Sequence, residues 1–291
     1  MTPPVLAGVD GSPASTAAAH WAAEEALRRD APLRLVHAWP WLTDGRAAYA
    51  DTDAPPAAAE QVVLDAAAAV RRRHPGLAVR ADVVLDAAVD GLVAAAADAA
   101  LLVLGSRGLG GFAGLLLGSV SMATVARSAV PAVVVRPGGR PDGTTGAPAA
   151  PPEVVVGIDT RAVDETVLAF AFREAALRGA RLRAVHGWDL PPAFATVGFV
   201  PSQPEVAELQ ALEVKALSQV LAGWRDRYPG TELVEQVGLG AARTLVAAAG
   251  AADLVVVGRR DRPHDFGRRL GLVAHAVLQH ADAPVAVVPH P

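Results

Sequence analysis

Three glycines and a serine near residue 105 have the types and the spacing to bind a phosphate. Gly105 and Gly108 are separated by two residues, and Gly118 and Ser119 follow after nine more. The apolar run 101–104 ends at Gly105, and Gly118 opens a predicted helix. Because glycine has no Cβ, backbone N–H groups in such a loop can approach a phosphate, and a helix N-terminus adds further donors. The pattern therefore predicts a phosphate site at the end of a strand.

Two common kinds of nucleotide site are disfavoured. The single lysine, Lys215, has no glycine-rich loop beside it, and the sequence lacks the Gly-Lys-Ser/Thr step of a Walker loop. The first apolar run, 5–9, leads into Asp10, Gly11 and Ser12 and not into Gly-x-Gly-x-x-Gly. A dinucleotide-dependent oxidoreductase is therefore disfavoured as well.

The composition excludes further classes of function. The net charge of −4 gives no electrostatic case for binding nucleic acid, and the absence of cysteine excludes disulfides and thiolate chemistry. No apolar run approaches the roughly 18 residues of a membrane helix, and no basic segment precedes the first apolar run. We expect a soluble cytoplasmic protein with neither nucleic acid nor membrane as a partner.

The sequence contains a tandem duplication. Residues 137–152 read PGGRPDGTTGAPAAPP, a composition typical of a linker, and the chain on one side matches the chain on the other. The predicted domains are therefore 1–136 and 153–291. The matched segments, in chain order, are 5–10 with 154–159, 35–39 with 184–188, 73–76 with 227–230, 101–105 with 254–258, and 130–135 with 283–288.

Each half alternates short apolar runs with longer alanine-rich stretches. Runs that are apolar at consecutive positions are typical of strands buried on both faces, and the stretches between them carry helix signals such as Ser12 followed by Pro13. The predicted fold is α/β, with two doubly wound domains that each place a five-stranded parallel sheet between two helical layers. Ligands of such sheets bind beyond the carboxyl ends of the strands, which directs attention to Asp10 and Gly105.

With these motifs in place, the first half resembles the nucleotide-binding branch of the universal stress protein family, and the tandem arrangement is known there. The family signature is Gly-x-x-Gly, nine residues, then Gly-Ser/Thr, after a first strand that ends in Asp. The resemblance covers nearly all of both halves and implies a fold like that of the adenine nucleotide alpha hydrolases. It also implies ten cofactor-binding residues, which are Asp10, Gly11, Ala38, Gly105, Arg107, Gly108, Gly118, Ser119, Val120 and Ser121.

The resemblance assigns roles along the bound nucleotide. Asp10 would bind the ribose or lie beside the adenosine, and the backbone of Ala38 would meet adenine. The segment from Gly105 to Gly108 would line the ribose and phosphate side. Residues 118–121 would offer N–H and hydroxyl groups to phosphate, which agrees with the positive dipole of a helix N-terminus. His37 is expected to be packed or hydrogen-bonded and not catalytic.

The second half departs from the signature. Asp159 and Gly258 remain, but Asp261 stands at the position of Gly108 and Leu272 at that of Ser119. A carboxylate there would repel phosphate, so we predict weak or absent ATP binding in this half. The loop instead contains several arginines, which bind another anion or are only solvated; they are Arg259, Arg260, Arg262, Arg268 and Arg269.

Three functional hypotheses remain open. The leading one is a regulatory stress-response module that binds ATP in the first domain, accompanied by Mg²⁺ or Mn²⁺ without a dedicated protein ligand. The second is a slow ATPase, for which the sequence offers no catalytic residue with a supporting partner. The third is a structural or protein-interaction module, which the second half fits better. The expected partners are an adenine nucleotide, a second copy of the chain in a dimer, and an unidentified regulatory protein.

Overall fold

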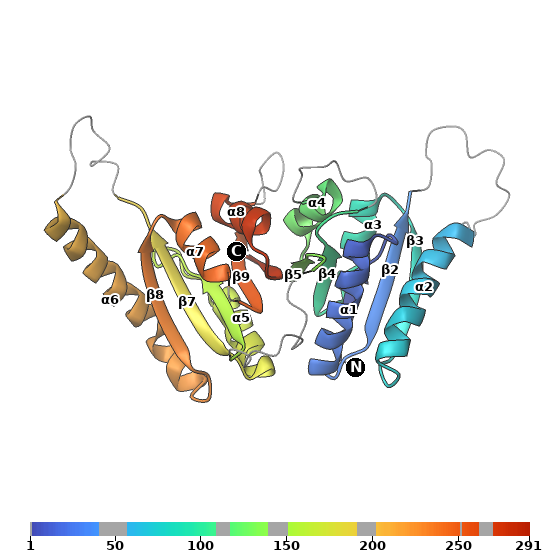
Figure 1. Ribbon diagram of the computed structural model, residues 1–291, viewed down its shortest axis with the longest axis horizontal. Coiled ribbons are helices and arrows are strands. Elements are labelled where there is room, and N and C mark those ends of the chain that lie inside the picture. Colours follow the sequence, from blue (N-terminus) through green and yellow to red (C-terminus); the bar gives the residue numbers. More distant parts are fainter. Residues whose placement is uncertain are drawn as a thin grey trace. The chain divides into compact units, whose positions relative to one another are not determined.

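The computed structural model describes residues 2–40, 57–108, 117–138, 151–190, 202–250, 252–261 and 270–291. These residues form two compact units, one up to residue 138 and one from residue 151 (Figure 1). The predicted linker 137–152 lies largely outside the described residues, so its boundaries stay a prediction. None of the helices in the described ranges combines the length and the apolar character that a membrane crossing requires.

The first unit is a parallel sheet with helices on both faces, as the alternating pattern predicts. Its strand order is β3-β2-β1-β4-β5, so the order reverses between β1 and β4. Its elements are β1 (Val5–Gly8), α1 (Pro13–Arg28), β2 (Leu33–Trp39), α2 (Ala57–Arg73), β3 (Val79–Leu85), α3 (Ala88–Ala95), β4 (Leu101–Gly105), α4 (Ser119–Arg127) and β5 (Ala132–Val135).

The second unit repeats this topology, with the strand order β8-β7-β6-β9-β10. Its elements are β6 (Glu153–Gly157), α5 (Glu165–Arg178), β7 (Arg181–Trp188), α6 (Gln203–Arg227), β8 (Leu233–Leu239), α7 (Ala241–Ala249), β9 (Leu254–Arg260), α8 (Leu272–His280) and β10 (Val285–His290). The predicted fold class is confirmed, with one such sheet in each unit.

Glycines at the ends of β1 and β4 set how closely the helices approach the first sheet. A Cβ on Gly8 would lie 2.9 Å from Leu104 and 3.1 Å from Leu92 of α3. A Cβ on Gly105 would lie on the opposite face, 2.6 Å from the carbonyl carbon of Ala14 in α1. Because that contact is with backbone, a side chain at Gly105 would push α1 away from the strand.

Helix α5 begins one turn later than its counterpart α1. Only two positions separate Asp10 from Ser12, the N-cap of α1, whereas five separate Asp159 from Asp164, the N-cap of α5. The intervening residues form a turn in which the Ala162 N–H donates to the Asp159 carbonyl at 3.1 Å. The duplicated sequences therefore differ in structure just after the first strand, where a ligand would meet the helix.

A buried ion pair is present in both copies. The fully buried carboxylate of Glu25 in α1 pairs with Arg29, and Glu174 in α5, 1 % exposed, pairs with Arg178 one turn along. The Arg178 side chain is itself only 6 % exposed. Both members of this pair lack access to bulk water, so each depends on the other for its charge to be balanced.

We expect Glu174→Gln to destabilise the second unit by about 3 kcal/mol, because it leaves the buried Arg178 without this counter-charge. The matched control is Glu165→Gln in the same helix, where the pair with Arg227 is 3.9 Å long and well exposed. It should cost less than about 1 kcal/mol. Urea unfolding of both variants measures the difference, and equally small losses would contradict the proposed importance of burial.

The N-cap of α5 should give its stability a defined pH dependence. Burial acts to raise the pKa of Asp164, but hydrogen bonds from Thr166 and the nearby His290 together lower it below the ordinary value of 3.8. The ionised cap therefore stabilises the fold fully above pH 3.8, and its contribution is lost as the pH falls through the lower folded-state pKa.

Asp164→Ala should accordingly cost about 1 kcal/mol between pH 5 and 7, and this cost should shrink below pH 4. Urea unfolding at several pH values measures it. Asp164→Asn is the control, since it keeps a capping oxygen that does not titrate. A cost for Asp164→Ala that stays constant down to the lowest pH at which the protein folds would refute the assignment.

Candidate functional site

A cavity of about 460 Å³ opens at the carboxyl ends of β1, β2 and β4 in the first unit. It lies where the strand order reverses, which is the usual ligand site of doubly wound sheets. Nine of the ten predicted residues line it. These nine are Asp10, Ala38, Gly105, Arg107, Gly108, Gly118, Ser119, Val120 and Ser121. The structure thus brings together residues that are more than a hundred positions apart in the sequence.

Gly11 is the one predicted residue outside this lining. Its φ of +80° lies in the left-handed region, which favours glycine, and it lets the chain turn from β1 into α1. Glycine at position 11 is therefore explained by the backbone conformation of this turn.

The carboxylate of Asp10 is held by the start of α1. Its Oδ1 accepts a hydrogen bond from the Ser12 N–H at 3.0 Å, and its own N–H donates to Ser15 Oγ at 3.2 Å. The second oxygen, Oδ2, lies so close to Gly108 that a Cβ there would stand 2.6 Å from it. The glycine of the motif is therefore required by Asp10 as well as by any phosphate.

The N-terminus of α4 lies at the cavity and has no side-chain cap among the described residues. Its N-cap is Gly118, which has no side chain to cap the helix, and Ser119 and Val120 in the first turn are exposed. The first N–H groups of a helix lack partners within the helix, and its dipole favours an anion there. The geometry at this helix end therefore suits a phosphate group.

Ser121 has a more structural role than the resemblance implies. Its side chain is buried, and its hydroxyl donates to the carbonyl of Gly105 at 2.7 Å. A second bond, from the Gly118 N–H to the Ser106 carbonyl at 2.7 Å, holds the same helix end. Both bonds fix α4 to the end of β4. The hydroxyl proton of Ser121 is used in this contact, so Ser121 contributes to the site by positioning the helix.

Sequence reasoning missed several residues that line the cavity. Ala88 and Leu92 of α3 contribute apolar surface, and Ser15 of α1 and His37 of β2 complete the wall. Because α3 is built from ordinary core residues, no local motif marks it as part of a site. The Nδ1 atom of His37 lies 2.7 Å from the Val9 carbonyl, so this nitrogen carries the proton. The expectation that His37 is hydrogen-bonded is confirmed.

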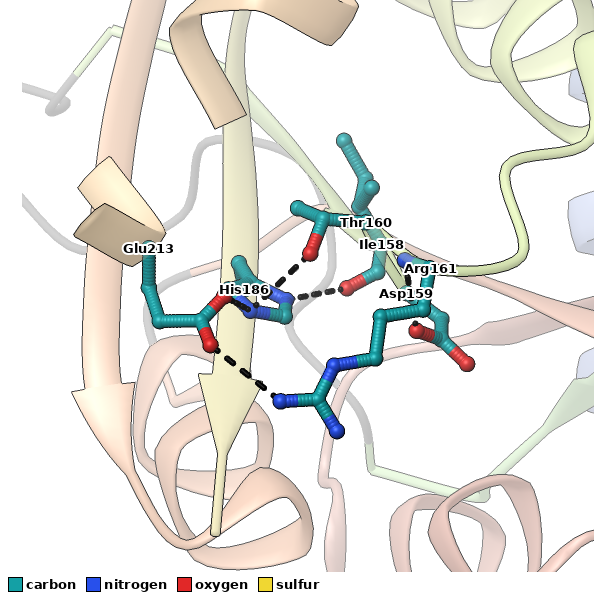
Figure 2. Close-up of polar contacts among 6 residues, drawn as sticks. All are labelled: Ile158, Asp159, Thr160, Arg161, His186 and Glu213. Carbon is teal, nitrogen blue, oxygen red and sulfur yellow. Dashed lines mark hydrogen bonds and ion pairs between the residues drawn. The ribbon is translucent and has the colours of Figure 1, made fainter. Parts of the chain in front are cut away.

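In the second unit, charged side chains occupy the corresponding region (Figure 2). His186, the counterpart of His37, places Nδ1 2.9 Å from the Ile158 carbonyl and Nε2 3.1 Å from Glu213. Glu213 also pairs with Arg161 at 3.3 Å, and the Thr160 hydroxyl lies 3.4 Å from His186 Nε2. We call Thr160, Arg161, His186 and Glu213 the His186 cluster. Its members come from the turn after β6, from β7 and from α6.

At the sequence position of Glu213, the first unit has no carboxylate. Alignment of 73–76 with 227–230 places Glu213 opposite Ala59, a buried residue of α2. Alignment of Asp159 with Asp10 places Arg161 opposite Ser12. The second unit has thus acquired an anion and a cation where the first has small side chains.

The phosphate side of the second unit is also altered. Asp261, at the position of Gly108, is paired with the buried Arg259 at 2.6 Å. Leu272 stands at the start of α8 and is 90 % exposed. Arg262, Arg268 and Arg269 lie outside the described residues. The second unit thus carries a carboxylate at the sequence position of Gly108 and an exposed leucine at that of Ser119, which favours the predicted asymmetry between the two units.

Comparison with known proteins agrees with the duplicated fold. The model of the universal stress protein family matches residues 1–136 and 152–289. Universal stress protein Rv2005c of Mycobacterium tuberculosis is 36 % identical over 97 % of this chain and 96 % of its own. Universal stress protein Rv2623 of the same organism is 33 % identical, with 97 % and 95 % covered.

Solved structures show the same architecture. A universal stress protein from Archaeoglobus fulgidus gives a TM-score of 0.60 at 16 % identity and covers 99 % of this chain and 98 % of its own. A putative universal stress protein from Pseudomonas aeruginosa gives 0.60 at 14 % identity, with 99 % and 93 % covered. With both halves matched by the family model, the chain belongs to the universal stress protein family and carries two of its domains in tandem.

Proposed function

We propose that this universal stress protein is a regulatory module that binds one adenine nucleotide, ATP, in its first unit. The observation that carries the proposal is that nine of the ten residues implied by the family resemblance line one cavity, beside the N-terminus of α4, which has no side-chain cap among the described residues. The volume of about 460 Å³ falls within the usual range for small-molecule sites.

The chemistry of the lining fits the parts of a nucleotide. Apolar side chains such as Leu92 provide a surface for a purine, and the Ala38 backbone offers it hydrogen-bonding groups. The carboxylate of Asp10 can accept hydrogen bonds from ribose hydroxyls. The N–H groups at the start of α4 and the guanidinium of Arg107 suit the phosphates.

The charge balance of the site favours a metal-bound nucleotide. Arg107 is the only arginine or lysine among the described residues that line the cavity, and the carboxylate of Asp10 lines the same cavity. A triphosphate carries more charge than one arginine balances, so Mg²⁺ or Mn²⁺ would accompany ATP. No group of three metal-binding side chains occurs in the described ranges, so phosphates and water would supply the other ligands.

The site is better suited to binding than to hydrolysis. Asp10 accepts a hydrogen bond from the Ser12 N–H, and His37 donates its Nδ1 proton to a backbone carbonyl, so the scaffold fixes the position of both side chains. We propose that ATP biases the association of the protein with a second copy and with a regulatory partner in the cytoplasm. The slow-ATPase hypothesis is ranked second.

The second unit favours a structural or protein-interaction role. The His186 cluster and the Asp261 carboxylate place charges where the first unit has small residues and glycine. We propose that this unit binds no nucleotide and that the protein takes up one nucleotide for each chain.

Titration of ATP in the presence of Mg²⁺ should give one site per chain by isothermal calorimetry. Denaturation of freshly purified protein, followed by chromatography, should release an adenine nucleotide. Absence of both bound nucleotide and a thermal shift with ATP would refute the proposed function. Two sites per chain would refute the asymmetry between the units.

Gly118→Ala is the sharpest substitution to test the site. The new Cβ would meet its nearest protein atoms at 3.6 Å, so the fold accommodates it, but it would stand beside the Gly108 N–H, where a phosphate would approach. Crowding of this kind costs about 1–3 kcal/mol, so we expect at least about fivefold weaker ATP binding.

Gly271→Ala is the matched control, because it makes the same change at the counterpart helix, where a Cβ meets nothing within 4 Å. It should leave the affinity for ATP unchanged. An equal loss of affinity in the two variants would contradict the proposal that ATP binds beside Gly118. Gly105→Ala is a poorer test, since its Cβ would collide with the α1 backbone and disturb the fold directly.

A further inference from the structure

Ser12 makes two different hydrogen bonds at the edge of the cavity. It is 3 % exposed and is the N-cap of α1, where its Oγ accepts from the Ser15 N–H at 3.1 Å. The same Oγ lies 3.3 Å from the carbonyl oxygen of Arg107. Because a carbonyl can only accept, the hydroxyl proton of Ser12 points to Arg107. One side chain thus caps a helix and bridges to the segment after β4.

This bridge joins two parts of the site that are far apart in the sequence. Arg107 directly precedes Gly108, and Gly108 lies against Asp10 Oδ2. The backbone N–H of Ser12 donates to the other oxygen, Oδ1, of the same carboxylate at 3.0 Å. Ser12 therefore contacts both sides of the gap in which a ribose and its phosphates would lie.

The second unit lacks this bridge. The N-cap of α5 is Asp164, whose carboxylate accepts from the Thr166 N–H and has no proton to donate when ionised. Arg161, at the sequence position of Ser12, turns toward Glu213 (Figure 2). The unit that has lost the glycine signature has therefore also lost the hydroxyl that holds the segment after the fourth strand.

We propose that Ser12 is a positioning residue of the nucleotide site. It fixes the distance between the Arg107–Gly108 segment and Asp10, so that a nucleotide can bind between them. The proposal rests on nucleotide binding by the first unit. Ser12 acts through the Arg107 carbonyl and the Asp10 carboxylate. Its loss should lower affinity for ATP without a matching loss of stability.

Ser12→Gly separates the role of Ser12 as the N-cap of α1 from its hydrogen bond to the Arg107 carbonyl. Glycine at an N-cap costs only a few tenths of a kcal/mol relative to serine, so α1 should keep its start while the bridge is lost. Ser12→Thr keeps a hydroxyl at this position and should bind ATP as the wild-type protein does. Thr16→Ala is the matched control, because it removes a hydroxyl of the same helical turn that bonds to the Ser12 carbonyl and not to Arg107.

Two measurements decide the proposal. Calorimetry with Mg²⁺-ATP should show about fivefold weaker binding for Ser12→Gly, the effect expected for one lost hydrogen bond, and wild-type affinity for the other two variants. Hydrogen exchange of the nucleotide-free protein should be faster at residues 104–108 in Ser12→Gly and unchanged in α1.

Wild-type affinity and exchange in Ser12→Gly would overturn the proposal, as would equal weakening in Thr16→Ala. A wild-type protein that binds no ATP would overturn the proposed function and the role of Ser12 in binding. The exchange experiment needs no nucleotide, so it would still show whether Ser12 holds the Arg107–Gly108 segment. A failure of the proposed function can therefore be distinguished from a failure of the proposed role of Ser12.

Discussion

The close approach of α1 to the end of β4 is the constraint on which the site of the first unit depends. A Cβ at Gly105 would lie 2.6 Å from the α1 backbone, so the helix rests directly on the strand. This contact puts the start of α1 beside the segment that leaves β4. Ser12 can then reach the Arg107 carbonyl, and Asp10 can lie against Gly108. A larger residue at Gly105 would separate these groups before any ligand arrived.

The fold class, Asp10 and the glycine–serine motif could be predicted from local signals, whereas the family resemblance supplied the other predicted residues of the cavity lining. Runs of buried apolar residues identify the strands, and glycine spacing marks the turn after β4. The bridge from Ser12 to Arg107 spans 95 positions and depends on helix packing that no local pattern encodes. The later start of α5 and the position of Glu213 depend on packing in the same way.

The two units share a scaffold and differ at the end of the sheet. Each has a histidine whose Nδ1 bonds the carbonyl at the end of the first strand, Val9 in one and Ile158 in the other. Each also buries a glutamate–arginine pair on the first helix. These interactions stabilise the fold whatever binds above the strands. The units differ at several positions near the carboxyl ends of the strands, where Arg161 and Asp261 stand at the positions of Ser12 and Gly108.

The His186 cluster also bears on how such a duplicated protein can change over generations. Glu213 is only 18 % exposed, and it contacts both the guanidinium of Arg161 and Nε2 of His186. Replacing Arg161 alone would leave the carboxylate with less compensating charge, while replacing Glu213 alone would leave His186 Nε2 without its carboxylate. Each single step back toward the small residues of the first unit thus passes through a less well-balanced arrangement. A substitution at one member of the His186 cluster is therefore better tolerated when another member changes with it.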